Sequence, residues 1–238
     1  MDTARRAVFS PVDSTARVDA VARRLTDAIA LGLLADGEQL PSEAELAGLL
    51  GVSTVTLREA LMALRQQGLV RTRRGRGGGS FVRTPAEAGD PSARLRTFGA
   101  DELRDLGDHY AAIAGAAARL AARRSLPGDV APLVRSLDEM SRARSPAQLR
   151  RLDGRFHIEV AAASQSARLT REEIRMQADI GPLIWLDHEH QSGRARVHAQ
   201  HRAIADAVQR GDCDQARDVA ERHVLEAVEH LIELRLAL

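Results

Sequence analysis

The chain has 238 residues, of which 44% are apolar and 3% aromatic, and its formal net charge is +1. This length allows one large domain or two ordinary ones, and the scarcity of aromatic residues favours a mainly helical fold over a β-sandwich. The single cysteine excludes an intrachain disulfide, and the sequence shows no signal peptide and no run of roughly 18 apolar residues, so we expect a cytoplasmic protein without a membrane partner.

Three helices are predicted in the first 68 residues. Apolar residues recur at helical spacing over residues 18–33. A second helix opens at Ser42, with two acids in its first turn, and stops at Gly51. Ser53 is placed to cap a third helix, which Gly68 ends. Two helices joined by a tight glycine-containing turn predict a helix-turn-helix.

A β-hairpin rich in arginine is predicted directly after the third helix. Residues 69–73 and 80–82 read as two short strands, and the glycines between them supply the reversal. Three helices followed by such a hairpin make a winged helix, whose third helix enters a major groove of DNA while the hairpin follows phosphates or the neighbouring minor groove. Arginines on an exposed hairpin can also be merely solvated surface residues. Here no acidic residue neutralises them, which favours contact with DNA. The basic residues are Arg71, Arg73, Arg74, Arg76 and Arg83.

The third helix carries the candidates for reading bases. Helical spacing places Thr54, Arg58 and Arg65 on one flank. Arg58 is the first candidate for a base or phosphate contact, because a guanidinium can pair with two acceptors at once. Thr54 and Thr56 could touch phosphates or a thymine methyl, although ordinary helix capping is an equal alternative for Thr56.

Residues 84–100 contain two prolines and little apolar content, which predicts a linker between a DNA-binding domain of residues 1–83 and a second domain of residues 101–238. Every strong segment of the second domain has helical period, so an all-α bundle of about six helices is expected. Pro182 is predicted to kink or split its helix. The expected helices span residues 101–124, 130–142, 146–163, 167–187, 196–209 and 214–236.

One carboxylate and three imidazoles form a candidate metal site. Asp153 and His157 lie four residues apart in a predicted helix and project from the same face. His201 and His223 lie in the next-to-last and last helices, which a short turn could pack against each other. Such ligands suit Zn²⁺ or another first-row divalent ion. An Asp/His pair at this spacing is more often a surface pair or a hydrogen bond, so spacing alone leaves both readings open.

The stretch QLPSEAELAGLLGVSTVTLREALMALRQQGLVRTRRGRGGGSFV resembles the DNA-binding domain of GntR-type bacterial transcription regulators. LDGRFHIEVAAAS and HRAIADAVQRGDCDQARDVAERHV resemble the helical, FCD-type ligand-binding domain of the FadR-like subfamily. The resemblance extends the expected DNA contacts to Ser42, Glu43 and Gly77. Where relatives often carry guanine-reading arginines, this chain has Ala44 and Thr54, so the operator sequence cannot be borrowed from them.

The resemblance also implies a metal and an effector. Many relatives bind a divalent ion through a D-x-x-x-H helix and two later histidines, and all four positions are matched by Asp153, His157, His201 and His223; zinc is expected, with nickel or manganese as alternatives. The effector of relatives is typically a small organic acid held by an arginine. Tyr110 stands at that arginine position, so the ligand is less acidic or is bound by another arginine. The candidate effector contacts are Tyr110, Arg155 and Arg175.

These observations predict a homodimeric regulator that binds an inverted-repeat operator in double-stranded DNA. Repression, relieved by a carboxylate or hydroxy-acid metabolite bound near the metal, is the mode that the resemblance implies. Two alternatives remain: a constitutive DNA-binding dimer with a structural metal or none, and a DNA-tethered metal-dependent enzyme. The enzyme is disfavoured because Glu159, two residues past His157, points away from a metal-activated water.

Overall fold

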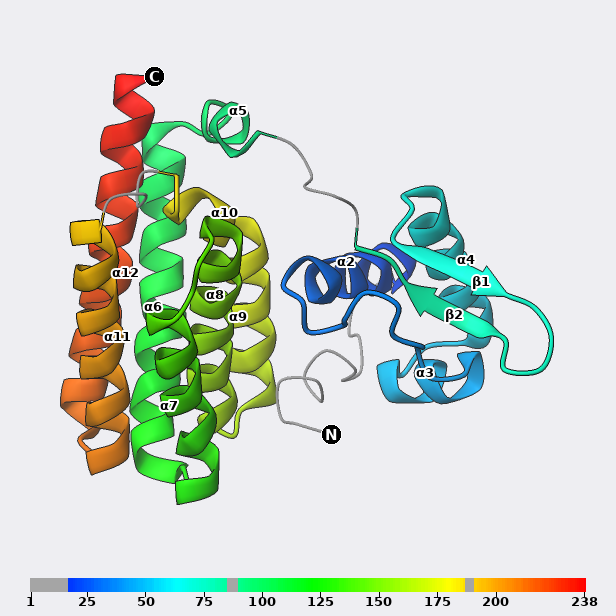
Figure 1. Ribbon diagram of the computed structural model, residues 1–238, viewed down its shortest axis with the longest axis horizontal. Coiled ribbons are helices and arrows are strands. Elements are labelled where there is room, and N and C mark those ends of the chain that lie inside the picture. The colour runs from blue at the N-terminus through cyan, green and yellow to red at the C-terminus, as the bar shows by residue number, and fades with distance from the viewer. Residues whose placement is uncertain (1–16, 85–89, 187–190) are drawn as a thin grey trace. The chain divides into compact units, whose positions relative to one another are not determined.

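The computed structural model describes residues 17–84, 90–186 and 191–238 (Figure 1). The chain divides into two compact units, residues 1–88 and residues 89–238. Each unit is described separately below.

The described residues of the first unit form three helices and a β-hairpin. The helices are α2 (Arg17–Ala30), α3 (Glu43–Leu50) and α4 (Thr54–Gln66), and the strands are β1 (Val70–Arg73) and β2 (Gly79–Val82). The apolar face of α2 is buried against α4. Leucines 57, 61 and 64 of α4 are buried on the inner side of the same core, which leaves the other side of α4 free to meet a ligand.

Local hydrogen bonds explain the sharp turn between α3 and α4, which are bent by 105°. Gly51 ends α3 in the left-handed conformation, with φ of 67°, and its N–H bonds back to the carbonyl of Gly48. Only glycine adopts this conformation without a steric cost. Ser53 then caps α4 by accepting a hydrogen bond from the Thr56 N–H. The helix-turn-helix is therefore formed as predicted.

The wing contains a third paired segment in addition to the two predicted strands. β1 and β2 pair antiparallel, from Val70 opposite Val82 to Arg73 opposite Gly79. Residues 37–40 add a third segment on the other side of β2, through a bridge between Gln39 and Phe81. At the tip, the Gly78 N–H bonds to the Gly75 carbonyl. The third segment ties the base of the wing to the turn before α3.

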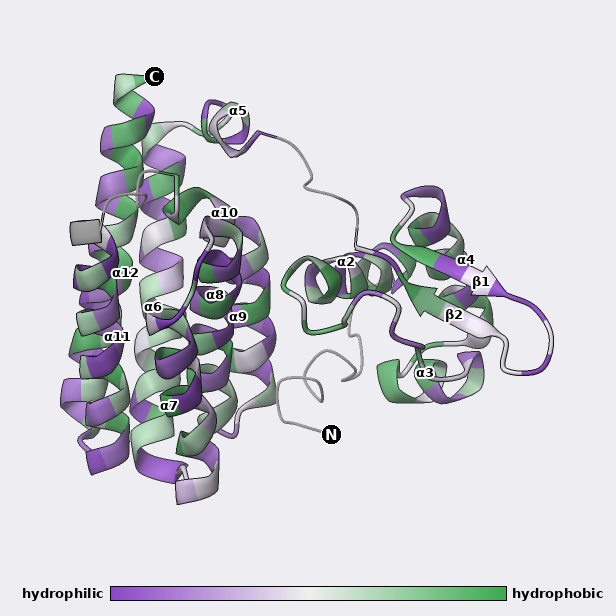
Figure 2. Cartoon of the chain, viewed as in Figure 1, coloured by the Kyte–Doolittle hydropathy of each residue, from purple (hydrophilic) through white to green (hydrophobic). Residues whose placement is uncertain are grey.

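The second unit is an all-helical bundle. It contains α5 (Pro91–Leu95), α6 (Ala100–Arg124), α7 (Pro127–Ser141), α8 (Pro146–Ala163), α9 (Ala167–Asp179), α10 (Gly181–Ile184), α11 (Gln191–Arg210) and α12 (Cys213–Ala237). α6 is the central helix and packs against α8, α9, α11 and α12. Figure 2 shows hydrophilic and hydrophobic residues interleaved along these helices, as amphipathic segments require.

The long helices α6 and α12 approach closely because glycine faces the partner helix. A Cβ added at Gly107 would lie 2.8 Å from a methyl carbon of Val228, and one added at Gly115 would lie within 2.5 Å of Glu221 Cγ. This close packing leaves little empty space in the bundle centre.

Three differences from the sequence-based expectations involve more than three residues each. The segment predicted as a linker contains helix α5, whose Leu95 is fully buried in the core of the bundle with Leu103; residues 85–89 lie outside the described part of the chain. The predicted helix over 167–187 ends at Asp179 and is followed by the short α10, so Pro182 accompanies a split as predicted. Helix α11 begins earlier than residue 196, at Gln191.

Within the described residues, no single helix is both long and apolar enough to cross a membrane, and only the bent pair α3–α4 passes that length and composition test jointly.

Candidate nucleic-acid interface and metal centre

The outer face of α4 presents the side chains that a DNA groove would meet. Thr54 and Arg58 are exposed there, as the helical spacing predicts. Val55, beside Thr54 in the first turn, is 61% exposed, although valine is usually buried. An exposed apolar side chain at the start of a recognition helix fits the methyl group of thymine. Sequence reasoning missed Val55 because apolar residues are assigned to the core by default.

Arg58 is paired with Glu43. The Arg58 Nε donates to the Glu43 Oε2 at 2.6 Å, and the side chains are 63% and 38% exposed. Glu43 begins α3 and Arg58 lies in the second turn of α4, so the pair spans the helix-turn-helix. A carboxylate is repelled by phosphate, and this pairing places Glu43 where it can orient the Arg58 guanidinium.

The side chains of three other predicted DNA contacts form hydrogen bonds within the domain. Ser42 caps α3 in a reciprocal capping box with Glu45. The Thr56 hydroxyl lies 2.9 Å from that of Ser53, which agrees with the capping alternative. Arg65 donates to the Thr72 hydroxyl at 2.9 Å and so joins α4 to β1. These side chains stabilise the frame that carries the exposed residues.

The wing presents a dense positive surface. Its arginines are exposed, and the guanidinium carbon of Arg73 lies 4.7 Å from the centre of the Phe81 ring, a cation–π contact that holds this side chain. Gly77 is also exposed and has φ of 79°. The predicted DNA contacts that are exposed on the tip and first strand are Arg71, Arg73, Arg74, Arg76 and Gly77.

In the second unit, the structure brings together all four predicted metal ligands. The Nε2 atoms of His157 on α8, His201 on α11 and His223 on α12 lie 3.1–3.3 Å from one another. An Oδ1 of Asp153 lies 3.5 Å from His201 Nε2. All four side chains are buried. His201 and His223 are 22 residues apart in the sequence. They meet because the short turn between α11 and α12 packs these two helices side by side (Figure 1).

These residues fit a divalent cation. His223 Nδ1 lies 3.0 Å from the acceptor Oε1 of Gln200, so it carries the proton and its Nε2 offers a lone pair to the cluster. Burial, with a contribution from His223, lowers the pKa of His157 and of His201 well below the usual value, which keeps these imidazoles neutral. Lone pairs directed at one point repel unless a cation lies between them. Two nitrogens bound to one tetrahedral zinc are separated by roughly 3.3 Å, close to the separations here.

The carboxyl group of Asp153 also responds to burial, which raises its pKa to about 7, against the opposing effect of a hydrogen bond from Trp185. A bound cation would favour its ionised form, because opposite charges stabilise each other. Asp153 is therefore suited to complete the ligand set of a cation held by the histidines.

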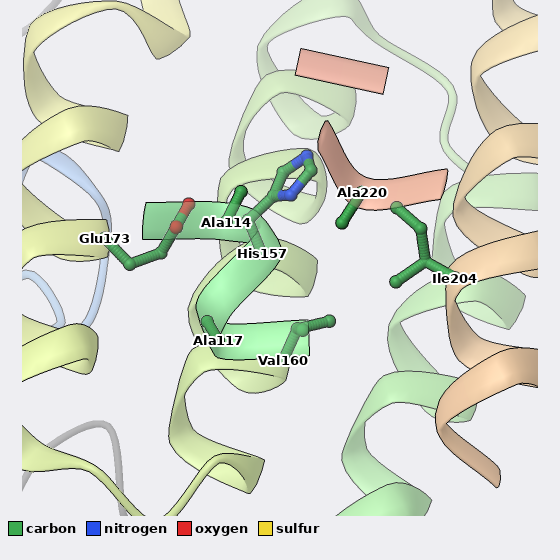
Figure 3. Close-up of a pocket in the computed structure, with 7 residues that line it drawn as sticks. All are labelled: Ala114, Ala117, His157, Val160, Glu173, Ile204 and Ala220. Carbon is green, nitrogen blue, oxygen red and sulfur yellow. The ribbon is translucent and has the colours of Figure 1, made fainter. Parts of the chain in front are cut away.

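A small cavity adjoins this cluster (Figure 3). Figure 3 shows the Glu173 carboxylate and the His157 imidazole among its lining residues, which also include Val160 and Ile204. About 10 Å³ is open to the centre of a water-sized sphere, which is room for roughly one water molecule. An organic ligand could enter only if the walls moved. The remaining lining residues are Ala114, Ala117 and Ala220.

Of the predicted effector contacts, Tyr110 lies nearest to this cavity. Its ring is buried 6.5 Å from that of His157, and its hydroxyl donates to Glu173 Oε1 at 2.9 Å. Arg155 and Arg175 are about half-exposed and pair with surface carboxylates, Arg155 with Glu139 and Arg175 with an acid one turn along its own helix. Neither arginine lines the cavity.

A winged helix joined to an all-helical unit is the architecture of a DNA-binding transcription regulator with a second, helical domain. The chain belongs to the GntR family of bacterial regulatory proteins: the model of that family matches residues 17–79 and the FCD domain model matches residues 105–226.

Similar proteins support this assignment. A Mycobacterium gastri protein, provisionally named HTH-type transcriptional regulator RmpR, is 37% identical over 235 residues, which cover 97% of this chain and 86% of the relative. The provisionally named L-lactate dehydrogenase operon regulatory protein of Escherichia coli is 32% identical over 222 residues, covering 87% and 83%. These relatives are regulators rather than enzymes, as the sequence predicts for this chain.

Among solved structures, Escherichia coli McbR/YncC has the same fold, with a TM-score of 0.53 at 18% identity over 92% of this chain and 98% of that one.

Proposed function

We propose that this regulator is a homodimeric repressor whose operator affinity is controlled by a small metabolite bound at a divalent metal in the helical unit. The observation that carries the proposal is the convergence of three buried imidazole nitrogens beside a cavity. Asp153, His157, His201 and His223 would hold the ion, with zinc as the expected metal and nickel or manganese as alternatives. The ion would supply an open coordination position for a carboxylate or hydroxyl oxygen.

The DNA-binding role of the first unit rests on α4 and the wing. In a dimer, two such units would read the halves of an inverted repeat, with Thr54, Val55 and Arg58 facing bases and the arginines of the wing on phosphates. Glu43, Ser42, Thr56 and Arg65 would support these contacts from within the domain.

The small size of the cavity suggests how a ligand would control operator affinity. A ligand can shift an equilibrium only through differential affinity for two states, typically about 1–3 kcal/mol, or 5- to 150-fold in operator affinity. Because the closed cavity excludes an organic molecule, ligand binding requires the surrounding helices to move. We propose that the segment over residues 84–100 transmits this movement to the DNA-binding unit.

The first test is the metal content per chain of untagged protein, measured by mass spectrometry. We expect about one equivalent in the parent protein, none in the Asp153→Ala, His157→Ala double variant, and an unchanged value in His109→Ala, which alters an exposed histidine. Absence of metal from the parent, even after addition of Zn²⁺ or Ni²⁺, would reject the metal-anchored sensor.

A second test addresses control of DNA binding. An operator selected from random duplexes should bind the metal-loaded protein, and a carboxylate or hydroxy acid that raises its melting temperature should weaken this binding. If acids bind without changing operator affinity, the helical unit is a dimerisation module with a structural metal, which is the constitutive alternative.

A further inference from the structure

The cavity beside the histidine cluster has an acidic wall. Among the lining residues that the structure describes, only His157 and Glu173 have ionisable side chains. Glu173 is 1% exposed and comes from α9, whereas the histidines come from α8, α11 and α12. The cavity is therefore bounded by one of the proposed metal ligands, His157, and by a buried carboxylate, Glu173.

Glu173 acts as a hydrogen-bond acceptor. Its Oε1 accepts from the Tyr110 hydroxyl at 2.9 Å and from the Gln177 amide nitrogen at 3.1 Å, and that amide also donates to the Tyr110 oxygen. All three side chains are buried. Within the described part of the chain, no hydrogen bond reaches Oε2 of Glu173. One carboxylate oxygen is thus fixed by the protein, and the other remains available to an occupant of the cavity.

The charges of the site determine which occupant it favours. Burial raises the pKa of Glu173, like that of Asp153, to about 7. A divalent ion would favour the ionised form of both groups, whose two negative charges would then balance the two positive charges of the ion. None of the described residues that line this cavity is an arginine. A dicarboxylate would bring two further negative charges into this buried space. The ion would meet one carboxylate, whereas the second would lie beside Glu173 with a large desolvation cost and no arginine among the described lining residues to offset it.

We propose that the effector presents a hydrogen-bond donor, an ammonium or a hydroxyl group, to Glu173 while a carboxylate at its other end meets the metal. The favoured ligand is a small zwitterion or hydroxy acid and not a dicarboxylate. This inference rests on the proposed function and adds the chemistry of the ligand's second end. Tyr110 and Gln177 are positioning residues for Glu173, because both donate hydrogen bonds to its Oε1.

A second small cavity shows where an acid would be recognised instead. Two of the proposed metal ligands, Asp153 and His223, line it, together with the exposed Arg196 and with Glu226. A ligand that entered there would meet a guanidinium rather than Glu173. Arg196 therefore provides the discriminating variant for the experiment.

The experiment compares four-carbon acids that share one carboxylate and differ at the other end: butanoate, 4-aminobutanoate, 4-hydroxybutanoate and succinate, together with the corresponding three-carbon series. Dissociation constants are measured by calorimetry on zinc-loaded protein. The amino and hydroxy members should bind about 10- to 100-fold more tightly than the unsubstituted acid and the diacid. Glu173→Gln should abolish this preference, and Glu172→Gln on the same helix should retain it.

Tightest binding of the diacids, with loss of that binding in Arg196→Ala, would overturn the proposal and place recognition in the second cavity. Equal binding of all members would also overturn the proposal, because Glu173 would then make no distinction between them. Binding of none would overturn it as well, because the proposed class of ligand would not be recognised. If the predicted preference is observed but the preferred ligand leaves operator affinity unchanged, the ligand chemistry stands and the sensor function fails.

Discussion

The exposed ion pair between Arg58 and Glu43 illustrates how single residues divide the task of DNA recognition. An isolated surface pair contributes about 0–1 kcal/mol to stability, so stability alone does not account for its placement across the helix-turn-helix. Glu43 holds the guanidinium by its Nε, which leaves the terminal nitrogens of Arg58 to pair with a base edge. We infer that Glu43 contributes to specificity through the orientation of Arg58.

A Glu43→Gln substitution tests this role. Removing a negative charge near DNA should raise affinity for non-specific duplexes, whereas loosening Arg58 should lower the preference for the operator. We expect the ratio of specific to non-specific affinity to fall about threefold to tenfold, measured by fluorescence anisotropy at one salt concentration. Glu59→Gln removes an exposed charge from α4 itself; an equal fall in this control would show that net charge, and not the pairing with Arg58, is responsible.

At the scale of the element, the wing depends on the backbone at its tip. A Cβ at Gly78 would lie 2.6 Å from the Arg73 carbonyl oxygen and 2.8 Å from that of Gly75. Backbone atoms cannot move aside as the end of a side chain can, so only glycine permits this turn. The position of the wing arginines therefore depends on a residue that has no side chain.

A Gly78→Ala substitution should displace the tip of the wing and weaken DNA binding about tenfold or more, because several phosphate contacts shift together. The melting transition of the helical unit should not change, as calorimetry can establish. Gly48→Ala serves as the matched control, since nothing lies within 4 Å of the added Cβ and alanine favours the helix by about 0.5–1 kcal/mol. Undiminished DNA affinity in Gly78→Ala would show that the wing does not contribute to binding.

At the scale of the whole molecule, the proposed metal joins three helices that are distant in sequence. His157, His201 and His223 come from α8, α11 and α12, and α11 and α12 both pack against the central α6. An ion that binds only the folded bundle stabilises it by mass action, by about 4 kcal/mol at a thousandfold excess over the dissociation constant. The ion would stabilise the helical unit and not the DNA-binding unit, because all of its proposed ligands belong to the helical unit.

Removal of metal by a chelator should therefore lower the melting temperature of the helical unit by roughly 8–16 °C, while the DNA-binding unit is unaffected. Differential scanning calorimetry separates the two transitions, and readdition of Zn²⁺ should restore the first. The His223→Ala variant should melt at the lower temperature with or without zinc. A chelator effect that persists in this variant would mean that the stabilising ion binds elsewhere.

The sequence by itself determined those features that depend on residues a few positions apart. Ser53, Gly51 and the leucines of α4 specify the helix-turn-helix through caps and periodicity, and Asp153 and His157 share a helix face because they are four residues apart. The linker was the weaker prediction: its composition is polar, but the buried Leu95 shows that part of it belongs to the bundle.

Only the tertiary structure decided which distant groups meet. The pairing of Glu43 with Arg58, the exposure of Val55 and the contact of Tyr110 with Glu173, 63 residues away, depend on how helices pack. Local sequence records the propensity of each helix and its apolar face, whereas the choice of partner across a helix interface comes from the shape of the assembled core. For this reason the sequence could indicate the metal ligands but not the acidic wall of the cavity beside them.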